Sequence, residues 1–308
     1  MIHEYALDPE LLSIWAGNDR DYAEFLREYG LGTPRIISSF PKKKLSKLRS
    51  SLLRTGPANT ESQQGRRYIE MVTKLIEAIV LREVPDNCNG SWGEAAKIEN
   101  ERLPFGVVLS SESIETAKNI TPDNMHAPDS IWNHPDQMTI QRTNEGFQSA
   151  ISNLTRLATR RIVIIDTYGW TTEAIAFTQF LINSVSEDRL SSAIPSITLF
   201  YKEKRGSDKS GRGSPSAKHV KEQIVQGLDD DVSNIELHVA ELREVAGNDV
   251  FHNRCILTEH GGVITGHGIG VSGEEEHTDE AILMRSAIYQ KKWNQFIEGN
   301  CFEIVSQA

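Results

Sequence analysis

Residues 161–170, RIVIIDTYGW, are an apolar run that ends in an aspartate and a tyrosine. Because its hydrophobic part does not alternate with polar residues, it predicts a strand that is buried on both faces of a sheet. Helical patterns flank this strand, with EGFQSAISNLTRLATR (145–160) before it and TEAIAFTQFLINSVSE (172–187) after it. A strand between two helices is the repeating element of α/β folds, in which helices cover both faces of the sheet.

The same order of strands and helices continues to the end of the chain. Further strands are expected at SITLFYKE (196–203), IELHVAEL (235–242), FHNRCILTE (251–259), GGVITGHGIG (261–270) and DEAILMRS (279–286). Helices are expected at AKHVKEQIVQGLDD (217–230) and SAIYQKKWNQFIEG (286–299). Residues 131–308 are therefore predicted to form one α/β domain, an α-β-α sandwich with a mainly parallel sheet.

The carboxyl ends of the expected parallel strands define one edge of this sheet, and ligands of α/β domains bind at that edge. Asp166, Tyr168 and Lys202 stand there, followed by the loop RGSDKSGRGSPS (205–216). These three side chains are candidates for lining a phosphate-binding pocket. Asp166 and Tyr168 are also compatible with a plain strand end closed by an Asx-type turn, and the Ser- and Gly-rich loop with a flexible linker.

Residues 1–130 show a different pattern and are predicted to be mostly helical. Apolar residues recur at spacings of three and four in residues 9–17, 19–30, 42–54 and 66–84. A single strand is expected at PFGVVLSS (104–111), and the proline-containing segment 119–138 is expected to link the two regions. The chain therefore divides into a helical region, 1–130, and the α/β domain, 131–308.

Positive charge is concentrated in two segments, although the chain as a whole has a net charge of −10. Residues 35–82 contain eleven Lys and Arg against three acidic residues, and residues 202–221 contain seven against two. Such segments are compatible with a polyanionic partner such as nucleic acid, and also with two solvated surfaces. If nucleic acid binds to the first segment, the expected contacts are Lys42, Lys43, Lys44, Arg66 and Arg67.

Several classes of protein find no support in the composition. No apolar run approaches the roughly 18 residues of a transmembrane helix, and MIHEYALDPELL at the N-terminus lacks the pattern of a signal peptide. The three cysteines are far apart and have no CxxC spacing, which indicates a reducing, cytoplasmic compartment and no zinc cluster. GHGIG and GRG are too short to be nucleotide-binding fingerprints, and the acidic run 273–280 lacks the spacing of an EF-hand. We therefore expect no metal, no cofactor and no membrane partner.

The segment FHNRCILTEHGGVITGHG (251–268) combines polar residues with two apolar runs joined by a glycine pair. On a strand, His252 and Arg254 would share one face about 7 Å apart, at roughly 3.3 Å per residue. An imidazole can attack or protonate a phosphoryl group, and a guanidinium can donate two parallel hydrogen bonds to it. Glu259 could hold a histidine nitrogen, and the second strand returns His267 beside the first. A histidine at a strand start is also commonly only solvated, so the residues alone leave both interpretations open.

The spacing His252-x-Arg254-x4-Glu259-x6-Gly266-His267 resembles the signature H-x-K-x4-D-x6-G-S of the phospholipase D superfamily. The preceding order of strands and helices resembles the half-domain of that superfamily. The strand ending IIDTY and the H-x-R motif resemble its variants with D-x-Y and H-x-R. The resemblance covers roughly residues 144–299, about half of the chain. Arginine replaces lysine, glutamate replaces aspartate, and His267 stands in place of serine.

The resemblance implies metal-independent cleavage of phosphodiesters. It assigns His252 as the nucleophile that forms a phosphohistidine, Arg254 as the phosphate ligand and Glu259 as the acid that orients His252. Only one H-x-R motif is present. The second histidine of the family mechanism would therefore come from His260 or His267, or from the second subunit of a homodimer.

Two functions are compatible with this resemblance. The first is a hydrolase acting on phosphodiester bonds, most simply a nuclease that holds nucleic acid along its basic segments. The second is a catalytically degenerate phospholipase-D-like subunit that binds nucleic acid or partner proteins encoded in the same operon. Domains of this type resemble those of bacterial operons for defence against phages and plasmids, so both alternatives imply a role in antiviral defence.

Overall fold

The computed structural model describes residues 1–84, 90–116, 118–128, 130–185, 189–206, 213–232, 234–252, 254–272, 276–299 and 301–308. The chain forms two compact units, Met1–Asp136 (unit 1) and Gln137–Ala308 (unit 2). The division falls a few residues beyond the boundary expected after residue 130. Trp132, on the far side of that expected boundary, is buried in the hydrophobic core of unit 1.

Unit 1 is an α/β unit in which helices predominate, and its sheet is the part that the sequence did not predict in full. Its described strands form a sheet in the order β2-β1-β3-β4, and all neighbouring strands are parallel. They are β1 (His3–Leu7), β2 (Arg35–Ile37), β3 (Val107–Leu109) and β4 (Asn119–Ile120). Only β3 was expected from the sequence. Strands as short as β2 and β4, with three and two residues, show no period in a sequence.

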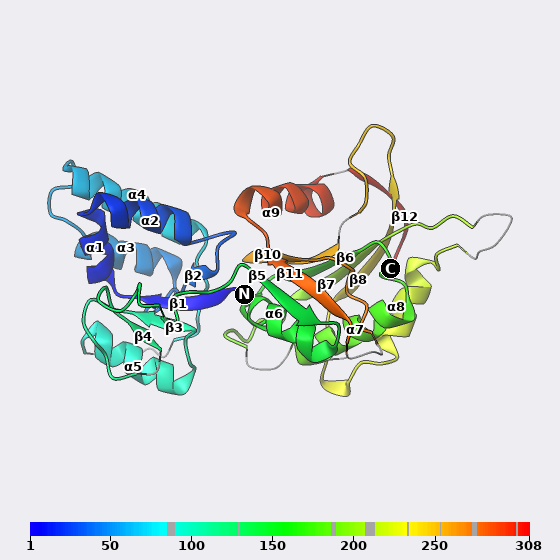
Figure 1. The fold of residues 1–308 in the computed structure, drawn as a ribbon, viewed down its shortest axis with the longest axis horizontal. Coiled ribbons are helices and arrows are strands. Elements are labelled where there is room, and N and C mark those ends of the chain that lie inside the picture. Colours follow the sequence, from blue (N-terminus) through cyan, green and yellow to red (C-terminus); the bar gives the residue numbers. More distant parts are fainter. Residues whose placement is uncertain are drawn as a thin grey trace. The chain divides into compact units, whose positions relative to one another are not determined.

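Helices cover both faces of the sheet of unit 1. They are α1 (Pro9–Ala16), α2 (Asp19–Glu28), α3 (Leu45–Thr55), α4 (Gln63–Glu77) and α5 (Trp92–Arg102). Helices α1 to α4 lie on one face and α5 on the other (Figure 1). Side chains alternate along β1, so that Tyr5 and Leu7 join the core under the first group, whereas Ala6 packs in the core under α5. The helices expected within residues 9–84 are confirmed, although the last one ends at Glu77.

The sheet of unit 2 is mixed and has the strand order β12-β8-β7-β6-β9-β10-β11-β5. Its strands are β5 (Gln137–Gln141), β6 (Arg161–Asp166), β7 (Ser196–Lys202), β8 (Leu237–Glu244), β9 (Arg254–Thr258), β10 (Gly261–Thr265), β11 (Thr278–Leu283) and β12 (Phe302–Gln307). The pairs β6–β7 and β7–β8 are parallel, and the other pairs are antiparallel. The expectation of a mainly parallel sheet is therefore wrong. Short connections such as the turn between β9 and β10 permit only antiparallel pairing.

Helices lie on both faces of this mixed sheet, as the sequence predicts. They are α6 (Asn144–Leu157), α7 (Thr172–Ser184), α8 (Ala217–Val225), the 3₁₀ turn η1 (Asp230–Val232) and α9 (Ser286–Trp293), which the π-helical turn η2 (Asn294–Glu298) continues. Helices α6, α7 and α8 cover one face, and α9 covers the other (Figure 1). Thr143 and Thr171 begin α6 and α7 by accepting hydrogen bonds from the backbone of the first turn.

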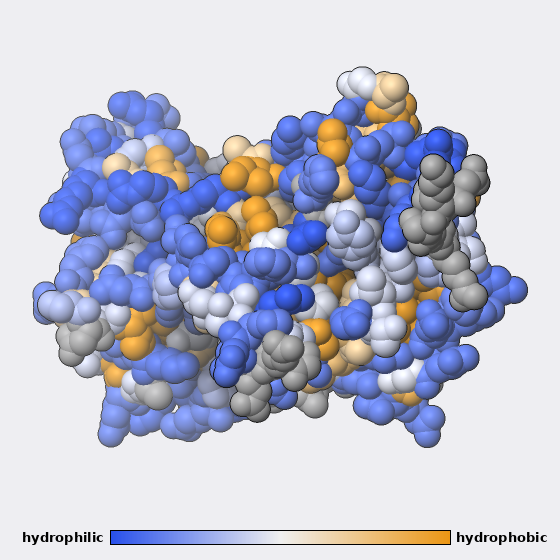
Figure 2. Space-filling model, turned by 45° about the vertical axis from the view of Figure 1, so that its right-hand side comes forward, coloured by the Kyte–Doolittle hydropathy of each residue, from blue (hydrophilic) through white to orange (hydrophobic). Residues whose placement is uncertain are grey.

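The surface is mostly hydrophilic on the face shown in Figure 2, where hydrophobic residues gather only in separate small groups. None of the described helices combines the length and the apolar character that crossing a membrane requires.

Candidate functional site

A surface pocket of about 290 Å³ opens in unit 2 beside β9, β10 and α9. It is lined by His252, Arg254, Cys255, Ile264, Thr265, Gly266, Met284 and Lys292. Three of these side chains are basic, and the described lining residues include no carboxylate. The pocket lies at the edge of the sheet where β6 ends, because Arg254 pairs with Asp166 in the ladder of β6 and β9. The composition of this lining suits an anion.

His252 and Arg254 line the same pocket, but they do not share one strand as the sequence analysis expected. Strand β9 begins at Arg254, and Asn253 lies outside the described residues. His252 is exposed and follows the fully buried Phe251, whose ring packs against Phe296 with centroids 5.2 Å apart. The backbone N–H of His252 donates to the carbonyl of Val250 (3.1 Å). A buried aromatic anchor therefore holds the exposed imidazole at the pocket.

The Arg254 guanidinium is held at the pocket wall by two contacts. Its Nη1 donates to the backbone carbonyl of Gly266 (3.0 Å), and its Cζ lies 5.6 Å from the centre of the Tyr168 ring. The Tyr168 side chain is half exposed. Tyr168 is not among the described residues that line the pocket, but its ring supports the guanidinium of Arg254.

Thr265 and Lys292 complete the polar lining, and neither was a candidate from the sequence. The Thr265 hydroxyl is buried and, within the described part of the chain, has no hydrogen-bond partner. Lys292 Nζ donates to Gln295 Oε1 (3.2 Å), and burial lowers the pKa of this lysine. No local sequence signal could have marked Lys292, because it stands on α9, some forty residues after the motif. An unpaired hydroxyl beside three bases is an arrangement that an anion would satisfy.

Cys255 also lines the pocket, but its chemistry excludes it as a nucleophile. Complete burial raises the pKa of the thiol to about 12, so the reactive thiolate is absent near neutral pH. Among the described residues that line the pocket, His252 is then the side chain suited to nucleophilic attack.

Glu259 does not approach His252. It lies beyond the other end of β9, where its Oε1 accepts hydrogen bonds from the backbone N–H of Thr159 (2.6 Å) and Arg160 (2.9 Å). These contacts tie the turn after β9 to the segment that leads into β6. The expectation that Glu259 orients the histidine is therefore not supported by the geometry, and its role is to fix the two strands in register.

Glu244, at the end of β8, is the carboxylate that holds the segment before His252. Its Oε1 lies 2.5 Å from Lys202 Nζ and also accepts the backbone N–H of Phe251 (2.7 Å). The hydrogen bond from Lys202 holds the pKa of Glu244 below its ordinary value. Lys202 was expected to bind phosphate, but its ammonium group is paired with Glu244. The position of Glu244 at a strand's carboxyl end was the signal that could have identified it.

Asp166 has a structural role. Its Oδ1 accepts the backbone N–H of Tyr168 (2.7 Å), which is the Asx-type turn considered above, and its Oδ2 accepts the N–H of Ile269 (2.8 Å). Gly268 has a φ of +95°, and a Cβ at this position would collide with Asp166 Oδ2. Burial raises the pKa of Asp166. The carboxylate therefore fastens the loop after β10 to the end of β6.

The second histidine of the expected mechanism is not among the described residues that line the pocket. His267 is largely exposed, and its Nδ1 lies 3.4 Å from Asp279 Oδ1. His260 is buried at the turn between β9 and β10, next to Glu259. Neither residue is placed to serve as the partner of His252.

The residues expected to contact nucleic acid belong to unit 1 and differ in their surroundings. Lys43 and Lys44 are exposed and precede α3, and Lys42 beside them is partly exposed. Arg67 lies 2.5 Å from Asp19 and stacks over the ring of Tyr22, and Arg66 donates to the backbone carbonyl of Glu61 (2.6 Å). Of the second basic segment, residues 207–212 lie outside the described residues, as do residues 273–275 of the acidic run and Cys88.

Comparisons with known proteins do not assign this chain to a family. No family model and no curated protein matches it. Among solved structures, TrmBL2, an archaeal chromatin protein whose structure shows a novel mode of DNA binding, aligns at 10% identity with a TM-score of 0.28. The alignment covers 56% of this chain and 55% of TrmBL2, so the chain spans about half the length of that protein. A similarity this low carries no argument about fold or function.

Proposed function

We propose that unit 2 is a metal-independent phosphodiesterase with a phospholipase-D-like site. One observation carries the proposal: His252, Arg254 and Lys292 line a single pocket together with Thr265, whose buried hydroxyl has no partner among the described residues. Basic side chains stabilise the oxygens of a phosphodiester, and the hydroxyl adds a neutral donor. The pocket volume of about 290 Å³ is sufficient for a phosphodiester group with its two adjoining substituents.

In this proposal the three basic side chains of the pocket carry out the reaction, and Lys292 has two tasks. Arg254 and Lys292 bind the non-bridging oxygens, while an imidazole nitrogen of His252 attacks phosphorus and displaces one ester oxygen with its bonding electrons. That oxygen takes a proton from the Lys292 ammonium group, whose lowered pKa favours the transfer. Water then attacks the phosphohistidine, returns a proton to Lys292 and releases a phosphomonoester and free His252.

The donor set favours this chemistry over one assisted by a divalent metal. Mg²⁺ and Ca²⁺ are bound chiefly by carboxylate and carbonyl oxygens, whereas the described side chains of the pocket are basic, apolar or neutral. Across the described ranges of the chain, no three histidine, cysteine or acidic residues gather into a metal-ligand cluster. The charge required at phosphorus is supplied instead by Arg254 and Lys292.

The alternative is a degenerate subunit that binds a phosphodiester without cleaving it and acts within a multi-protein defence complex. Two features favour it: Arg254 replaces the lysine of the family signature, and His252 is the one histidine among the described lining residues. In a homodimer, His252 of the partner subunit could enter the same site and supply the second histidine. Measured cleavage of a phosphodiester by the purified protein therefore decides between the two alternatives.

The deciding experiment measures hydrolysis of bis-p-nitrophenyl phosphate and of labelled nucleic acid in EDTA, by wild-type protein and by the H252A variant. We expect at least roughly a hundredfold loss of rate in H252A, because the nucleophile is removed. His267→Ala is the matched control, since this exposed histidine lies outside the described lining of the pocket. Equal rates in wild type and H252A would refute the phosphodiesterase. No hydrolysis by wild type, combined with phosphate binding that depends on Arg254, would establish the degenerate subunit.

A further inference from the structure

The loop and helix at residues 42–54 of unit 1 form a surface of uniform charge. We call it the α3 cationic surface, and it comprises Lys42, Lys43, Lys44, Lys47, Arg49 and Arg54. No acidic residue occurs from Phe40 to Thr60. All of these basic side chains are exposed except that of Lys42, which is partly exposed. These like charges therefore repel one another.

Some other cations of unit 1 are paired with carboxylates. Lys97 lies 3.0 Å from Glu115, and Arg67 lies 2.5 Å from Asp19. In contrast, Lys44, Lys47 and Arg49 form no ion pair with any residue in the described part of the chain. Arg66 and Arg67, which the sequence predicts as contacts together with the lysines, stand on α4 and not on this surface. Arg67 pairs with Asp19, and Arg66 donates to the backbone carbonyl of Glu61.

The start of helix α3 is unfavourable for these lysines. Lys44 is the N-cap residue and provides no side-chain hydrogen bond to the helix. Cations are destabilising at this end, because the unpaired N–H groups of the first turn give it a partial positive charge. An acidic or Ser/Thr cap is the ordinary arrangement. A bound anion would remove both the repulsion among the lysines and the conflict with the helix dipole.

The orientation of α3 is fixed by its buried face. Leu48 and Leu52 are each 3% exposed and belong to the core of unit 1. The hydroxyl of Tyr68 on α4 donates to the carbonyl of Leu52 (2.7 Å). The helix therefore cannot roll to bury its basic side chains.

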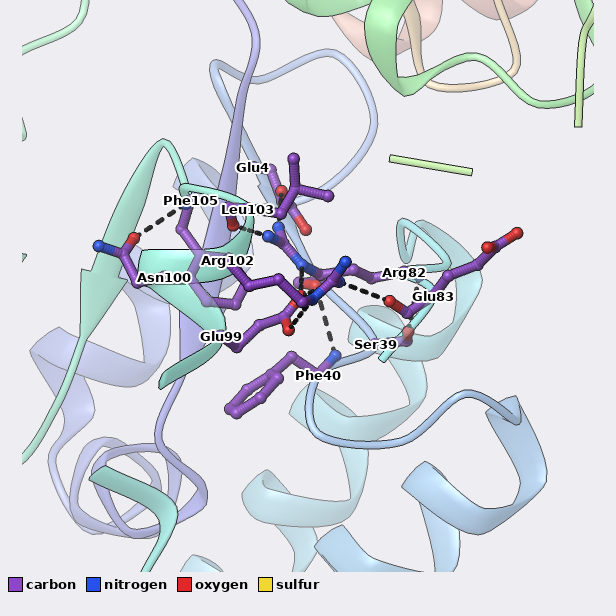
Figure 3. Close-up of polar contacts among 11 residues, drawn as sticks. Glu4, Ser39, Phe40, Arg82, Glu83, Glu99, Asn100, Arg102, Leu103 and Phe105 are labelled. Atoms are coloured by element: carbon purple, nitrogen blue, oxygen red, sulfur yellow. Dashed lines mark hydrogen bonds and ion pairs between the residues drawn. The ribbon is translucent and has the colours of Figure 1, made fainter. Parts of the chain in front are cut away.

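The loop that carries the lysines is anchored to a buried network of charges. Lys42 N–H donates to the Ser39 carbonyl (2.8 Å), and Ser39 Oγ accepts the N–H of Arg82 (3.0 Å). The Arg82 guanidinium, in turn, lies 2.7 Å from Glu4 Oε2 and 2.6 Å from Glu99 Oε1 (Figure 3). The loop follows β2 at the carboxyl edge of a parallel sheet, the edge where ligands of such sheets bind. The cations are thus presented on a rigid support.

We infer that the α3 cationic surface binds the phosphate backbone of duplex nucleic acid. Single strands are bound by stacking their bases on aromatic rings, and residues 41–60 contain no aromatic residue. An anionic membrane would require a continuous free apolar face on the helix, but Leu48 and Leu52 are buried, so that Leu45 and Leu53 are the large apolar side chains that α3 exposes. A row of cations without either feature matches backbone contacts that are independent of sequence. If unit 2 is the proposed phosphodiesterase, duplex nucleic acid bound at this surface is its substrate class. Binding of the duplex to the surface does not itself depend on cleavage.

The test measures fluorescence anisotropy of a labelled DNA duplex of about 20 base pairs with the full chain across a range of salt concentrations. The triple variant K44Q/K47Q/R49Q is compared with wild type. We expect at least roughly a tenfold loss of affinity at about 100 mM salt, and the slope of log K against log salt should fall by about one for each phosphate that no longer meets a cation. The matched control R27Q/K97Q/K218Q removes three exposed cations that are paired elsewhere, and it should bind like wild type.

Three results would overturn the inference. The first is equal affinity and salt slope in wild type and K44Q/K47Q/R49Q, and the second is an equal loss of affinity in the control variant. The third is tighter binding to a single strand of the same sequence, or to phosphatidylserine vesicles, than to the duplex. The outcome is separable from that of the phosphodiesterase. H252A should retain duplex binding, and K44Q/K47Q/R49Q should retain hydrolysis of bis-p-nitrophenyl phosphate.

Discussion

Lys202 Nζ lies 2.5 Å from Glu244 Oε1, and this ion pair joins the carboxyl ends of β7 and β8. The same oxygen accepts the backbone N–H of Phe251, the residue before His252. The pair therefore positions the histidine loop, and it removes Lys202 from the group of cations that could bind a substrate.

Replacing Glu244 with glutamine should reduce stability in a manner that depends on pH. The hydrogen bond from Lys202 holds the pKa of Glu244 below its ordinary value. A lowered carboxyl pKa adds stability above the ordinary pKa, and that contribution is lost as the pH falls through the folded value. The difference in Tm between wild type and E244Q should therefore be largest near pH 7 and should shrink toward about pH 3. If the difference in Tm between wild type and E244Q grows as the pH falls, the pKa of Glu244 is not lowered in the folded protein.

Thr265→Val should raise stability and weaken anion binding at the same time. The substitution preserves the shape of the side chain and removes a buried hydroxyl that has no partner among the described residues. We expect a gain of about 1 kcal/mol in the free energy of unfolding, together with roughly a five- to tenfold loss of affinity for inorganic phosphate. Thermal unfolding and isothermal titration calorimetry measure the two effects. If T265V binds phosphate as well as wild type, the hydroxyl does not face the anion.

Lys292 should give phosphate binding a distinctive alkaline limit. Because burial lowers the pKa of Lys292, its ammonium group loses the proton at a lower pH than an ordinary lysine does. Affinity for phosphate should then fall as the pH rises from about 8 to 10, a range in which phosphate remains a dianion. K292R should abolish this decline, because arginine stays protonated, and K292M should bind weakly throughout. If affinity for phosphate declines with pH in K292R as it does in wild type, the decline comes from the titration of another group.

Arg82→Met should destabilise unit 1 strongly. The side chains of Arg82, Glu4 and Glu99 are at most 2% exposed, so the substitution removes a buried cation from two buried carboxylates, of which Glu99 keeps only its contact with Arg102. We expect a loss of about 3–5 kcal/mol. R102M is the control, because Arg102 also pairs with Glu99 but is 43% exposed, and it should cost about 1 kcal/mol or less.

Hydrogen exchange resolved by mass spectrometry can locate this effect in unit 1. Phosphate binding by unit 2 should survive in R82M. If R82M and R102M lose similar amounts of free energy of unfolding, burial of the charged network does not control the stability of unit 1.

The sequence predicted the elements of unit 2 better than their pairing. The apolar run that became β6, and the helices α6 and α7 beside it, follow from periodicity, because each is long enough to display one. Strand direction does not follow from periodicity. Strands β5 and β12 lie at the two edges of the sheet, where partial exposure weakens the hydrophobic signal.

The candidate site was predicted in part. His252 and Arg254 are neighbours in the sequence, so their joint position could be inferred from local spacing. Lys292 and Thr265 reach the pocket through the packing of α9 and β10 against β9, which no local pattern encodes. The assignment of Glu259 failed for a related reason. Glu259 stands at the sequence spacing of the family signature, but its carboxylate does not contact His252. It accepts hydrogen bonds from the backbone of Thr159 and Arg160 at the opposite end of β9.

The most direct test of the proposed site is a crystal structure of the chain soaked with tungstate, an anion that mimics a phosphoryl group under attack. We expect tungstate in the pocket of unit 2, in contact with His252, Arg254 and Lys292, and its loss from the pocket in the R254Q variant. Tungstate bound elsewhere on unit 2 while this pocket stays empty at saturating concentration would contradict it.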